Sequence, residues 1–429
     1  MARREFSVDY LARVEGEGSI DLVALDGRLS EIKFSIFEPP RLFEAFLVNR
    51  TYDEVPDMTA RICGICPVAY QMSSVHAMEK AFGIHVDGQL RKLRRLMYCG
   101  EWLESHLLHM FMLHAPDFLG YDSVISMAGD HPDLVKMALG MKRTGNSIVA
   151  TLGGREIHPV SVRVGGFYRI ITKGELTGLL PRLREARENA ARAAEWVATL
   201  QYPDFTHDAE YASLVHPDEY PMNEGRVVSN KGLDITPEEF PDYILEEQVP
   251  YSTSLQYRVK ARGPFFTGPL ARVNLNFEKL TPQAQEIAAR SGIRFPNTNS
   301  FTSIFARALE VVHCFNEAIS IIEEYEEPPV PYVPHMARAS TGAAITEAPR
   351  GMLYHRYELD DDGCVRSANI VPPTSMNQRQ IEQDLRDYIP RVLNLPNERV
   401  TYIAETVVRN HDPCISCSTH MLKIRFRRG

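Results

Sequence analysis

The sequence predicts an α+β fold that is mainly helical: one large domain, residues 1–429, around a bundle of long helices with β elements at its periphery. Three observations favour this fold. Apolar residues make up 44% of the 429 residues, which is enough for a large core. Several segments repeat apolar residues at three- and four-residue steps, as amphipathic helices do. Two C-x-x-C motifs lie near opposite ends of the chain, and if they serve one buried metal site, the two terminal segments must meet there.

The first 45 residues predict an antiparallel β element. Apolar and polar residues alternate over 19–23 and again over 31–36, and Asp26-Gly27 between them is a typical turn. Long amphipathic patterns follow, separated by Gly and Pro clusters. We therefore expect helices over residues 89–114, 132–150, 174–200 and 299–325.

The rest of the chain predicts smaller elements. Residues 202–272 are rich in Pro, Tyr and Asp, and we expect loops and short strands there, packed on the helices. Residues 353–359 alternate like a strand, and residues 360–363 (D-D-D-G) predict a hairpin turn. A final helix is expected near 377–394, before the second cysteine pair.

Composition and charge exclude several functional classes. Lys and Arg total 47 against 56 Asp and Glu, a formal charge of −9, whereas an electrostatic nucleic-acid binder usually carries a basic domain. No stretch reaches the ~18 uninterrupted apolar residues of a membrane span. Arg3 and Arg4 are followed by no apolar run, so no signal peptide is expected. We expect a cytoplasmic chain with no nucleic-acid partner.

The seven cysteines are few and odd in number, as in proteins of reducing compartments. Two pairs stand out, in R-I-C-G-I-C (Cys63 and Cys66) and in D-P-C-I-S-C-S-T-H (Cys414 and Cys417). The isolated cysteines are expected to be small buried hydrophobes: Cys99, Cys314 and Cys364.

Two C-x-x-C turns can bring four thiolates to one metal. Soft thiolates select zinc, iron–sulfur clusters, nickel or copper(I). A structural zinc site is one alternative, although zinc ribbons usually keep their pairs within ~15–20 residues of one another. A dithiol redox pair is another, although no thioredoxin-like βαβ pattern surrounds either motif.

The two cysteine motifs resemble the signatures of the large, catalytic subunits of [NiFe]-hydrogenases, R-x-C-G-x-C near the start and D-P-C-x-x-C-x-x-H at the end. The resemblance covers almost the whole chain. Other matching blocks lie at residues 13–16 (R-V-E-G), 41–44, 104–117, 153–158 and 347–351 (E-A-P-R-G). Within the family, the short chain and residues 412–418 look most like cytoplasmic NADP-linked sulfhydrogenase-type enzymes.

This resemblance implies that the chain splits H2 reversibly into protons and electrons at a nickel–iron centre. Cys63 and Cys414 would bind nickel terminally, while Cys66 and Cys417 would bridge nickel and iron. The iron would carry carbon monoxide and cyanide ligands.

The resemblance also implies roles in proton transfer. A terminal thiolate, that of Cys414, or transiently Arg350 would accept the first proton, and Glu15 would relay it outward. Arg350 would lie over the metals, anchored beside the acidic neighbours Asp117 and Asp412.

Three more residues would line the centre. Pro349 and Thr374 would face the diatomic ligands, Thr374 as a hydroxyl donor. Ile65, between the first two cysteines, would pack at the inner mouth of an apolar gas route; a plain core position is an equal alternative.

The resemblance further implies a magnesium ion (Mg2+) held by Glu44 and His420 with waters and a backbone carbonyl near Ile370. An imidazole is an unusual ligand for magnesium, which prefers oxygen. The assignment therefore rests on the resemblance alone.

Two groups of side chains need separate interpretation. The family usually has a histidine four residues after its second cysteine, where this chain has Tyr70; its hydroxyl or nearby His76 could replace that histidine. On the helix expected over 89–114, the three histidines lack the Glu-x-x-His spacing of di-iron bundles, so we interpret them as structural: His106, His109 and His114.

The chain contains neither G-x-G-x-x-G nor a P-loop motif. Since the four motif cysteines are used at the centre, electrons are expected to leave through iron–sulfur clusters of a small subunit. The FAD and NAD(P) sites would belong to further electron-transfer subunits. Two alternatives are a non-catalytic, complex I-like quinone-module subunit, a relative that has lost the cysteines, and a zinc-stabilised scaffold protein.

The segment after His420 contains four basic residues, which cannot share a buried metal site without an anionic partner or solvent: Lys423, Arg425, Arg427 and Arg428. Family members are typically cut by a maturation protease after this histidine. We therefore expect residues 421–429 to be a C-terminal extension removed on maturation.

Overall fold

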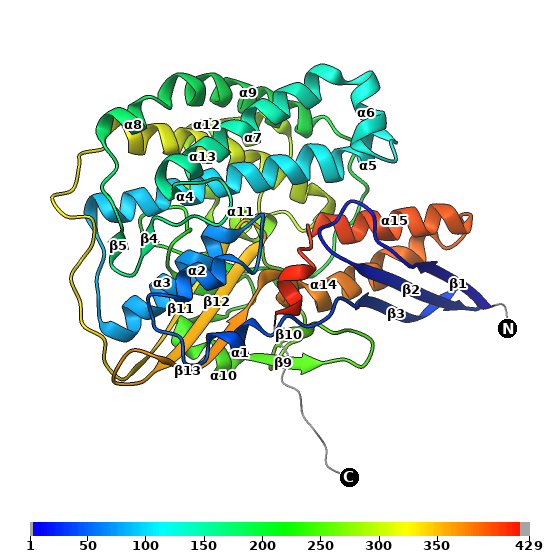
Figure 1. Cartoon of the computed structure of the whole chain (residues 1–429). Helices are drawn as coiled ribbons and strands as arrows, with labels where there is room; N and C mark the ends of the chain where they lie inside the picture. The colour runs from blue at the N-terminus through cyan, green and yellow to red at the C-terminus, as the bar shows by residue number, and fades with distance from the viewer. Residues whose placement is uncertain (1–2, 421–429) are drawn as a thin grey trace, which may run out of the picture.

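Long helices form one half of the molecule (Figure 1). The structure is a computed structural model that describes residues 3–420, so the expected extension 421–429 lies outside the described residues. The central helix α4 packs against both α7 and α13, and α9 covers α13 and α7. The main helices of this half are α4 (Gly88–Leu107), α7 (Pro132–Gly153), α9 (Leu180–Ala198), α12 (Pro282–Ser291) and α13 (Ser303–Glu323).

A three-stranded antiparallel sheet lies below this bundle in Figure 1, with its strands in the order β11-β12-β13. Helix α3 (Pro67–Phe82) packs on β11 and β12. The strands are β11 (Ser340–Ala348), β12 (Gly351–Leu359) and β13 (Val365–Val371). The expected strand and its hairpin turn are confirmed by β12 and by Gly363, which has a positive φ of 76°.

The N-terminal segment forms a second antiparallel sheet, β1 (Arg3–Val8), β2 (Gly18–Leu25) and β3 (Arg28–Ile36). Asp26 and Gly27 make the expected turn, with φ angles of 49° and 77°. The buried face of this sheet packs on the last two long helices, α14 (Pro373–Tyr388) and α15 (Asn397–Asn410), in a hydrophobic cluster of its own. The N-terminal sheet and the last two long helices therefore lie side by side.

Three expected helices have different bounds in the structure. The helix of 89–114 changes to a π-helix, η1 (Leu108–His114), after α4. The helix of 174–200 is divided into α8 (Lys173–Thr177) and α9, because Gly178 ends the first and Pro181 lies in the first turn of the second. The last expected helix ends at Tyr388 rather than 394, and α15 follows it without having been expected.

The remaining elements are short. Residues 202–272 form loops and short strands, as expected, with a small helix among them: β6 (Ala212–Val215), β7 (Arg226–Ser229), β8 (Asp234–Ile235), α10 (Phe240–Tyr243), β9 (Ile244–Gln248), β10 (Leu255–Val259). The others are α1 (Phe43–Leu47), α2 (Val55–Ala60), α5 (Ala115–Leu119), α6 (Val124–Asp130), β4 (Val162–Arg163), β5 (Gly166–Phe167), α11 (Pro269–Asn276), and the single turns η2 (Pro237–Glu239), η3 (Phe277–Lys279), η4 (Ser300–Thr302), η5 (Ile389–Val392) and η6 (Ser416–Thr419). No helix within residues 3–420 is long and apolar enough to cross a membrane.

Candidate metal centre

The four motif cysteines converge in the interior, and all are at most 5% exposed. Cys63 and Cys66 lie in the turn between α2 and α3, where Pro67 starts the helix. Cys414 lies in the loop that follows α15, and Cys417 lies in the single turn η6 (Ser416–Thr419) directly after it. The four sulfur atoms are within 4.8 Å of one another, and no other group of three or more candidate metal ligands converges among the described residues.

The individual distances show a compact cluster. The Sγ atoms of Cys63 and Cys66 are 2.8 Å apart, and each lies 3.7 Å from a sulfur of the second pair. The Sγ atoms of Cys414 and Cys417 lie 2.50 Å apart. Because the metal ligand is the thiolate, metal binding requires this second pair in its reduced form.

Backbone hydrogen bonds hold the C-terminal loop between N-terminal segments. Ile415 N–H donates to the carbonyl of Glu15 at 2.9 Å. The N–H groups of Arg41 and Phe43 donate to the carbonyls of Thr419 and His420 at 2.7 and 3.0 Å. The two ends of the chain thus build the centre jointly.

Glu15 contacts the second cysteine pair with its side chain as well. Its Oε2 lies 3.2 Å from Cys414 Sγ, within hydrogen-bond reach of a protonated thiol, and accepts Ser416 N–H at 3.1 Å. Glycine is required at the next position: Gly16 has a φ of 89°, and a Cβ there would lie 2.5 Å from Glu38 Oε1.

Arg350 reaches the centre from the turn between β11 and β12 and is 2% exposed. Its Nε donates to the carbonyl of Asp412 at 2.9 Å and lies 3.2 Å from that residue's Oδ1. Burial by itself would lower the pKa of Arg350, but Asp412 and the thiols of Cys66 and Cys63 hold it above its ordinary range. Its Nη1 and Nη2 have no hydrogen-bond partner within residues 3–420.

Asp117 does not lie beside Arg350 as expected. Both of its carboxylate oxygens are used by Arg409, at 2.7 and 2.8 Å, and Arg13 contacts Oδ1 at 2.6 Å. The expected pairing of Asp117 with Arg350 is wrong. Arg409 takes this carboxylate instead, and the helix that carries Arg409, α15, was not expected from the sequence. Asp117 thereby connects α5 with α15 and with the segment before Glu15.

The other expected lining residues lie close to the cysteines or to Arg350. The hydroxyl of Thr374 accepts Cys414 N–H at 2.9 Å rather than serving only as a donor. Pro349 precedes Arg350 in the turn and is buried. Ile65 is partly buried, packs on the core, and its N–H points to Cys63 Sγ at 3.3 Å.

The three residues expected at magnesium also meet. The carboxylate of Glu44 accepts Ile370 N–H at 2.7 Å, and His420 Nε2 lies 3.1 Å from the carbonyl of Ile370. His420 is completely buried.

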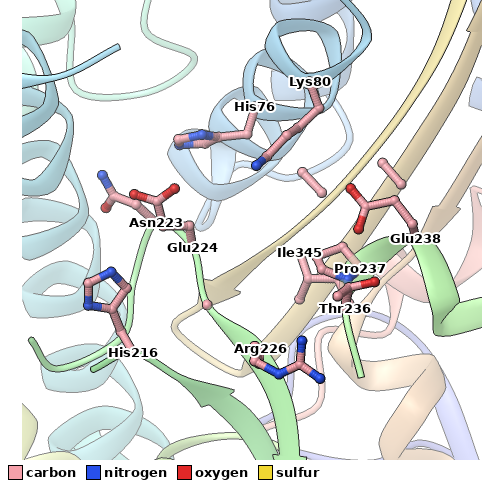
Figure 2. A pocket seen from close by; sticks show the side chains of 13 residues that line it. His76, Lys80, His216, Asn223, Glu224, Arg226, Thr236, Pro237, Glu238 and Ile345 are labelled. Carbon is pink, nitrogen blue, oxygen red and sulfur yellow. The ribbon is translucent and has the colours of Figure 1, made fainter. Parts of the chain in front are cut away.

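Tyr70 and His76 lie in different surroundings. Tyr70 is 1% exposed, its ring lies 6.1 Å from that of His420, and its hydroxyl has no partner within the described chain. His76 instead lines a separate cavity of about 300 Å³ with Lys80 and Asn223, shown in Figure 2. Tyr70, not His76, is therefore the side chain beside the metal centre.

The three histidines of α4 and η1 bind protein groups, in agreement with their structural interpretation. His106 pairs with Glu310 at 2.8 Å, and His109 bonds the carbonyl of Arg409 at 2.8 Å. His114 lies 3.0 Å from Asp117.

One buried acid near the centre was missed from the sequence. Glu101 on α4 accepts the N–H groups of Val68 and Ala69, at 2.6 and 3.0 Å, at the start of α3 directly after Cys66. Burial raises its pKa well above the ordinary value. No local motif links Glu101 to these N–H groups, since they lie in another helix.

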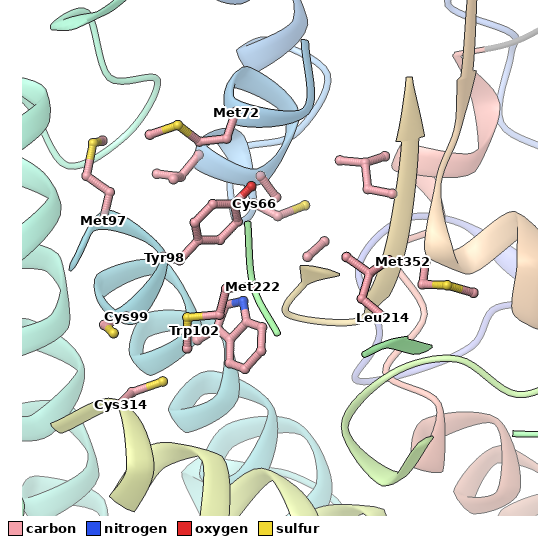
Figure 3. Close-up of a cluster of buried hydrophobic side chains, with 14 of the residues drawn as sticks. Cys66, Met72, Met97, Tyr98, Cys99, Trp102, Leu214, Met222, Cys314 and Met352 are labelled. Carbon is pink, nitrogen blue, oxygen red and sulfur yellow. The ribbon is translucent and has the colours of Figure 1, made fainter. Parts of the chain in front are cut away.

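The surroundings of Cys66 are apolar and rich in sulfur (Figure 3). Cys99 and Cys314 are completely buried in this core, as expected for isolated cysteines, while Cys364 is partly exposed. The other members drawn include Met72, Met97, Tyr98, Trp102, Met222 and Met352.

Comparisons with known proteins agree with the geometry. The family model "Nickel-dependent hydrogenase" matches residues 41–133. The chain is 32% identical to sulfhydrogenase 1 subunit alpha of Pyrococcus furiosus over 97% of this chain and 98% of that protein. It is 27% identical to the NAD-reducing hydrogenase HoxS subunit beta of Cupriavidus necator, over 98% and 95% of the two chains.

A solved structure of an NAD+-reducing [NiFe]-hydrogenase in the H2-reduced state superposes with a TM-score of 0.87 and 28% identity, covering 97% of this chain and 99% of the other. These comparisons give no support to the quinone-module or zinc-scaffold alternatives. The chain therefore belongs to the large-subunit family of nickel-dependent hydrogenases.

Proposed function

We propose that this catalytic subunit splits H2 at a nickel–iron centre held by its four buried cysteines and passes the electrons to a partner subunit. The observation that carries this proposal is the convergence of four sulfur atoms, from both ends of the chain, within 4.8 Å. Soft thiolates suit nickel and iron.

The residues around the sulfur atoms fit such a centre. Cys63 and Cys414 would hold nickel terminally, and Cys66 and Cys417 would bridge it to an iron that carries carbon monoxide and cyanide. When bound, the metal pair supplies the soft, redox-active acceptor for H2 cleavage that side chains lack. The Nη atoms of Arg350 are buried and have no hydrogen-bond partner within the described residues. Carbon monoxide and cyanide would be hydrogen-bond acceptors for them, because a buried charged donor without a partner is costly.

Side chains of the protein then transfer the proton that is released from H2. The thiolate of Cys414 accepts it at Sγ, and Glu15 takes it at Oε2 over 3.2 Å. The hydrogen bond from Ser416 N–H holds that oxygen in place. Asp412 fixes Arg350 through Nε, so that Nη1 and Nη2 remain available toward the centre.

Other residues would complete the site. Pro349 and Thr374 line the diatomic ligands, and Ile65 packs where an apolar gas route would enter. Glu44, His420 and the carbonyl of Ile370 would hold Mg2+ with waters, which the contacts of Glu44 and His420 with Ile370 support.

Electrons would leave through the iron–sulfur clusters of a small subunit, and FAD-containing subunits would deliver them to NAD(P) in the cytoplasm. The likeness to a sulfhydrogenase alpha subunit and to a subunit of an NAD-reducing hydrogenase supports this route. The chain itself carries no dinucleotide-binding signature.

Elemental analysis and H2-dependent dye reduction on the purified complex test the proposal. We expect nickel and iron together in the wild type, and loss of nickel and of activity in Cys414→Ala. Cys99→Ala, at another fully buried cysteine, should keep both. Full nickel and normal activity in Cys414→Ala would refute the ligand assignment, and zinc alone would refute the function.

We also propose that the active enzyme ends at His420, after a maturation protease removes residues 421–429. The buried position of His420, whose carbonyl accepts Phe43 N–H, supports a chain end seated inside the protein. Intact mass spectrometry of active enzyme tests this, and full activity at the mass of the 429-residue chain would contradict it.

A further inference from the structure

Arg272 is a completely buried arginine on α11 whose five N–H groups are all used. Nε and Nη2 donate to the two carboxylate oxygens of Glu310 at 2.7 and 2.8 Å, and Nη1 donates to Glu347 at 2.9 Å. The two remaining N–H groups donate to the carbonyls of Ala348 and Pro349, each at 2.9 Å.

Both carboxylates are themselves held in place. Tyr220 O–H donates to Glu310 at 2.7 Å, and His106 contacts its other oxygen at 2.8 Å. Leu214 N–H donates to Glu347 at 2.7 Å. The guanidinium also lies 4.1 Å from the centre of the Trp102 ring. Arg272 therefore has one defined position.

The two carbonyls that Arg272 holds belong to the turn that carries Arg350. The start of α11 packs against the same turn: a Cβ on Gly268 would lie 2.7 Å from the carbonyl oxygen of Arg350. Gly351 has a φ of 138°, and a Cβ there would lie 2.7 Å from Thr267 Cγ2. The turn is fixed from two directions, which leaves its backbone little freedom to shift.

We propose that Arg272 is a positioning residue for the reaction: by holding the carbonyls of Ala348 and Pro349, it sets the direction in which the guanidinium of Arg350 meets the four cysteines. This inference rests on the role of Arg350 in the proposed function. A buried ion pair is a weak source of stability, and a hydrophobic replacement often does as well. The five fixed donors of an arginine give a more specific reason for its presence, because they match five acceptors.

Arg272→Lys is the decisive variant. Lysine keeps the charge but has three donors on one nitrogen, so it cannot serve the carboxylates and both carbonyls together. In the purified complex, we expect nickel and iron content to be retained and the infrared bands of the diatomic iron ligands to shift or broaden. The kcat for H2 oxidation should fall by about 10- to 100-fold, as expected for a misplaced catalytic group.

Arg94→Lys is the matched control. Arg94 is 1% exposed and forms a two-bond pair with Glu79, at 2.8 and 2.6 Å, but it donates no hydrogen bond to the turn. We expect a comparable loss of thermal stability, with unchanged infrared bands and kcat. Arg350→Lys shows whether the bands respond to that guanidinium.

The outcomes separate the positioning role from a structural one. If Arg272→Lys and Arg94→Lys behave alike in bands and kcat while the wild type is nickel-loaded and active, the positioning role is wrong and the proposed function stands. A wild type without nickel or H2 activity refutes the proposed function itself. If Arg272→Lys fails to fold, Gly268→Ala replaces it, because its added Cβ presses on the Arg350 carbonyl from the other side. We expect this variant to shift the same infrared bands. Unshifted bands would overturn the proposal.

Discussion

Glu15 joins the N-terminal segment to the second cysteine pair through its backbone and its carboxylate. Its position 3.2 Å from Cys414 Sγ is what a proton acceptor for that thiol requires. The same contact can be altered without changing its shape, because glutamine is isosteric with glutamate.

We expect Glu15→Gln to retain nickel and iron but to lower the exchange of D2 with water by about 100-fold or more, since an amide cannot carry the proton. Mass spectrometry of the gas phase measures this exchange. Glu17→Gln, an exposed carboxylate two residues away, is the control and should be unaffected. Exchange at the wild-type rate in Glu15→Gln would exclude Glu15 as the relay.

Tyr70 is a second single-residue test. Its buried hydroxyl has no partner in the described part of the chain, and an unsatisfied buried polar group costs about 1–3 kcal/mol. We expect Tyr70→Phe to leave the free energy of unfolding unchanged or to raise it by about 1 kcal/mol.

Tyr220→Phe is the control for this experiment, because the Tyr220 hydroxyl donates to buried Glu310 at 2.7 Å. Its loss should destabilise the protein by about 1–3 kcal/mol in chemical unfolding. An equal loss in Tyr70→Phe would show that the Tyr70 hydroxyl is bonded after all.

At the residue scale, spacing predicts some of the site and misses the rest. The two cysteine motifs, with Glu15 and Arg350 in their own blocks, are local patterns, and the structure brings them together. Glu101 and Arg272 belong to no motif, because their partners come from other helices or strands. Asp117 was assigned to the wrong arginine for the same reason.

At the scale of elements, periodicity predicts the long helices best. Helices α7 and α13 lie within three or four residues of their expected ends. The sequence did not predict helix α15. Its residues, NERVTYIAETVVRN, include many β-branched side chains, which favour strands. Its apolar face is stabilised in the helix by packing on the N-terminal sheet, a contact that no local pattern reveals.

The close packing of α4 on α7 depends on Gly100 in α4 and Gly145 in α7. A third glycine, Gly140 in α7, lies away from this contact and serves as a control. A Cβ on Gly145 would lie 2.8 Å from Leu103 Cβ and 3.0 Å from the carbonyl of Gly100, while a Cβ on Gly140 meets nothing within 4 Å. We expect Gly145→Ala to destabilise the protein by about 1–3 kcal/mol through overpacking.

Gly140→Ala in the same helix should instead stabilise the protein by about 0.5–1 kcal/mol, because alanine is the better helix former. Thermal unfolding of the two variants measures the difference. If both alanines stabilise, the helices can separate without cost and the packing argument is wrong.

At the scale of the whole molecule, the N-terminal sheet packs against the last two long helices. The cysteine motifs indicate that the ends meet, but the sequence does not reveal that β1–β3 and α14–α15 form a second hydrophobic cluster at that junction. Strand β11 was also not expected, although it packs on α3 and leads into the turn of Arg350. Long-range pairing of this kind leaves no mark in local periodicity.

The Arg272 network joins three elements that are far apart in the sequence, since Arg272 lies on α11 and its two acids come from α13 and β11. Its two glutamates differ in pKa. Burial raises the pKa of Glu347 to about 7, with Arg272 opposing the shift only in part. Burial acts in the same direction on Glu310, but Arg272 and His106 overcome it and lower the pKa of Glu310 to about 2. The ordinary value for both is 4.5.

The two acids should therefore affect stability in opposite ways. Glu347 is protonated in the folded state up to about pH 7 and loses that proton on unfolding above pH 4.5, so its contribution to stability falls as pH rises from 4.5 to 7. Glu310 stays ionised when folded and takes up a proton on unfolding below pH 4.5, so its contribution is present above pH 4.5 and is lost as pH falls toward 2.

We expect Glu347→Gln, which mimics the protonated acid, to gain stability relative to the wild type as pH rises from 4.5 to 7, by about 3 kcal/mol in total. Glu310→Gln should be less stable than the wild type throughout that range, because the glutamine cannot pair with Arg272 as a charge. Chemical unfolding at each pH, with nickel content measured on every sample so that metal loss is scored separately, provides the test. If the free energy of unfolding of Glu347→Gln and of the wild type changes with pH in parallel, Glu347 is already ionised beside Arg272. Arg272 would then form ion pairs with two charged carboxylates, those of Glu310 and Glu347, rather than with Glu310 alone.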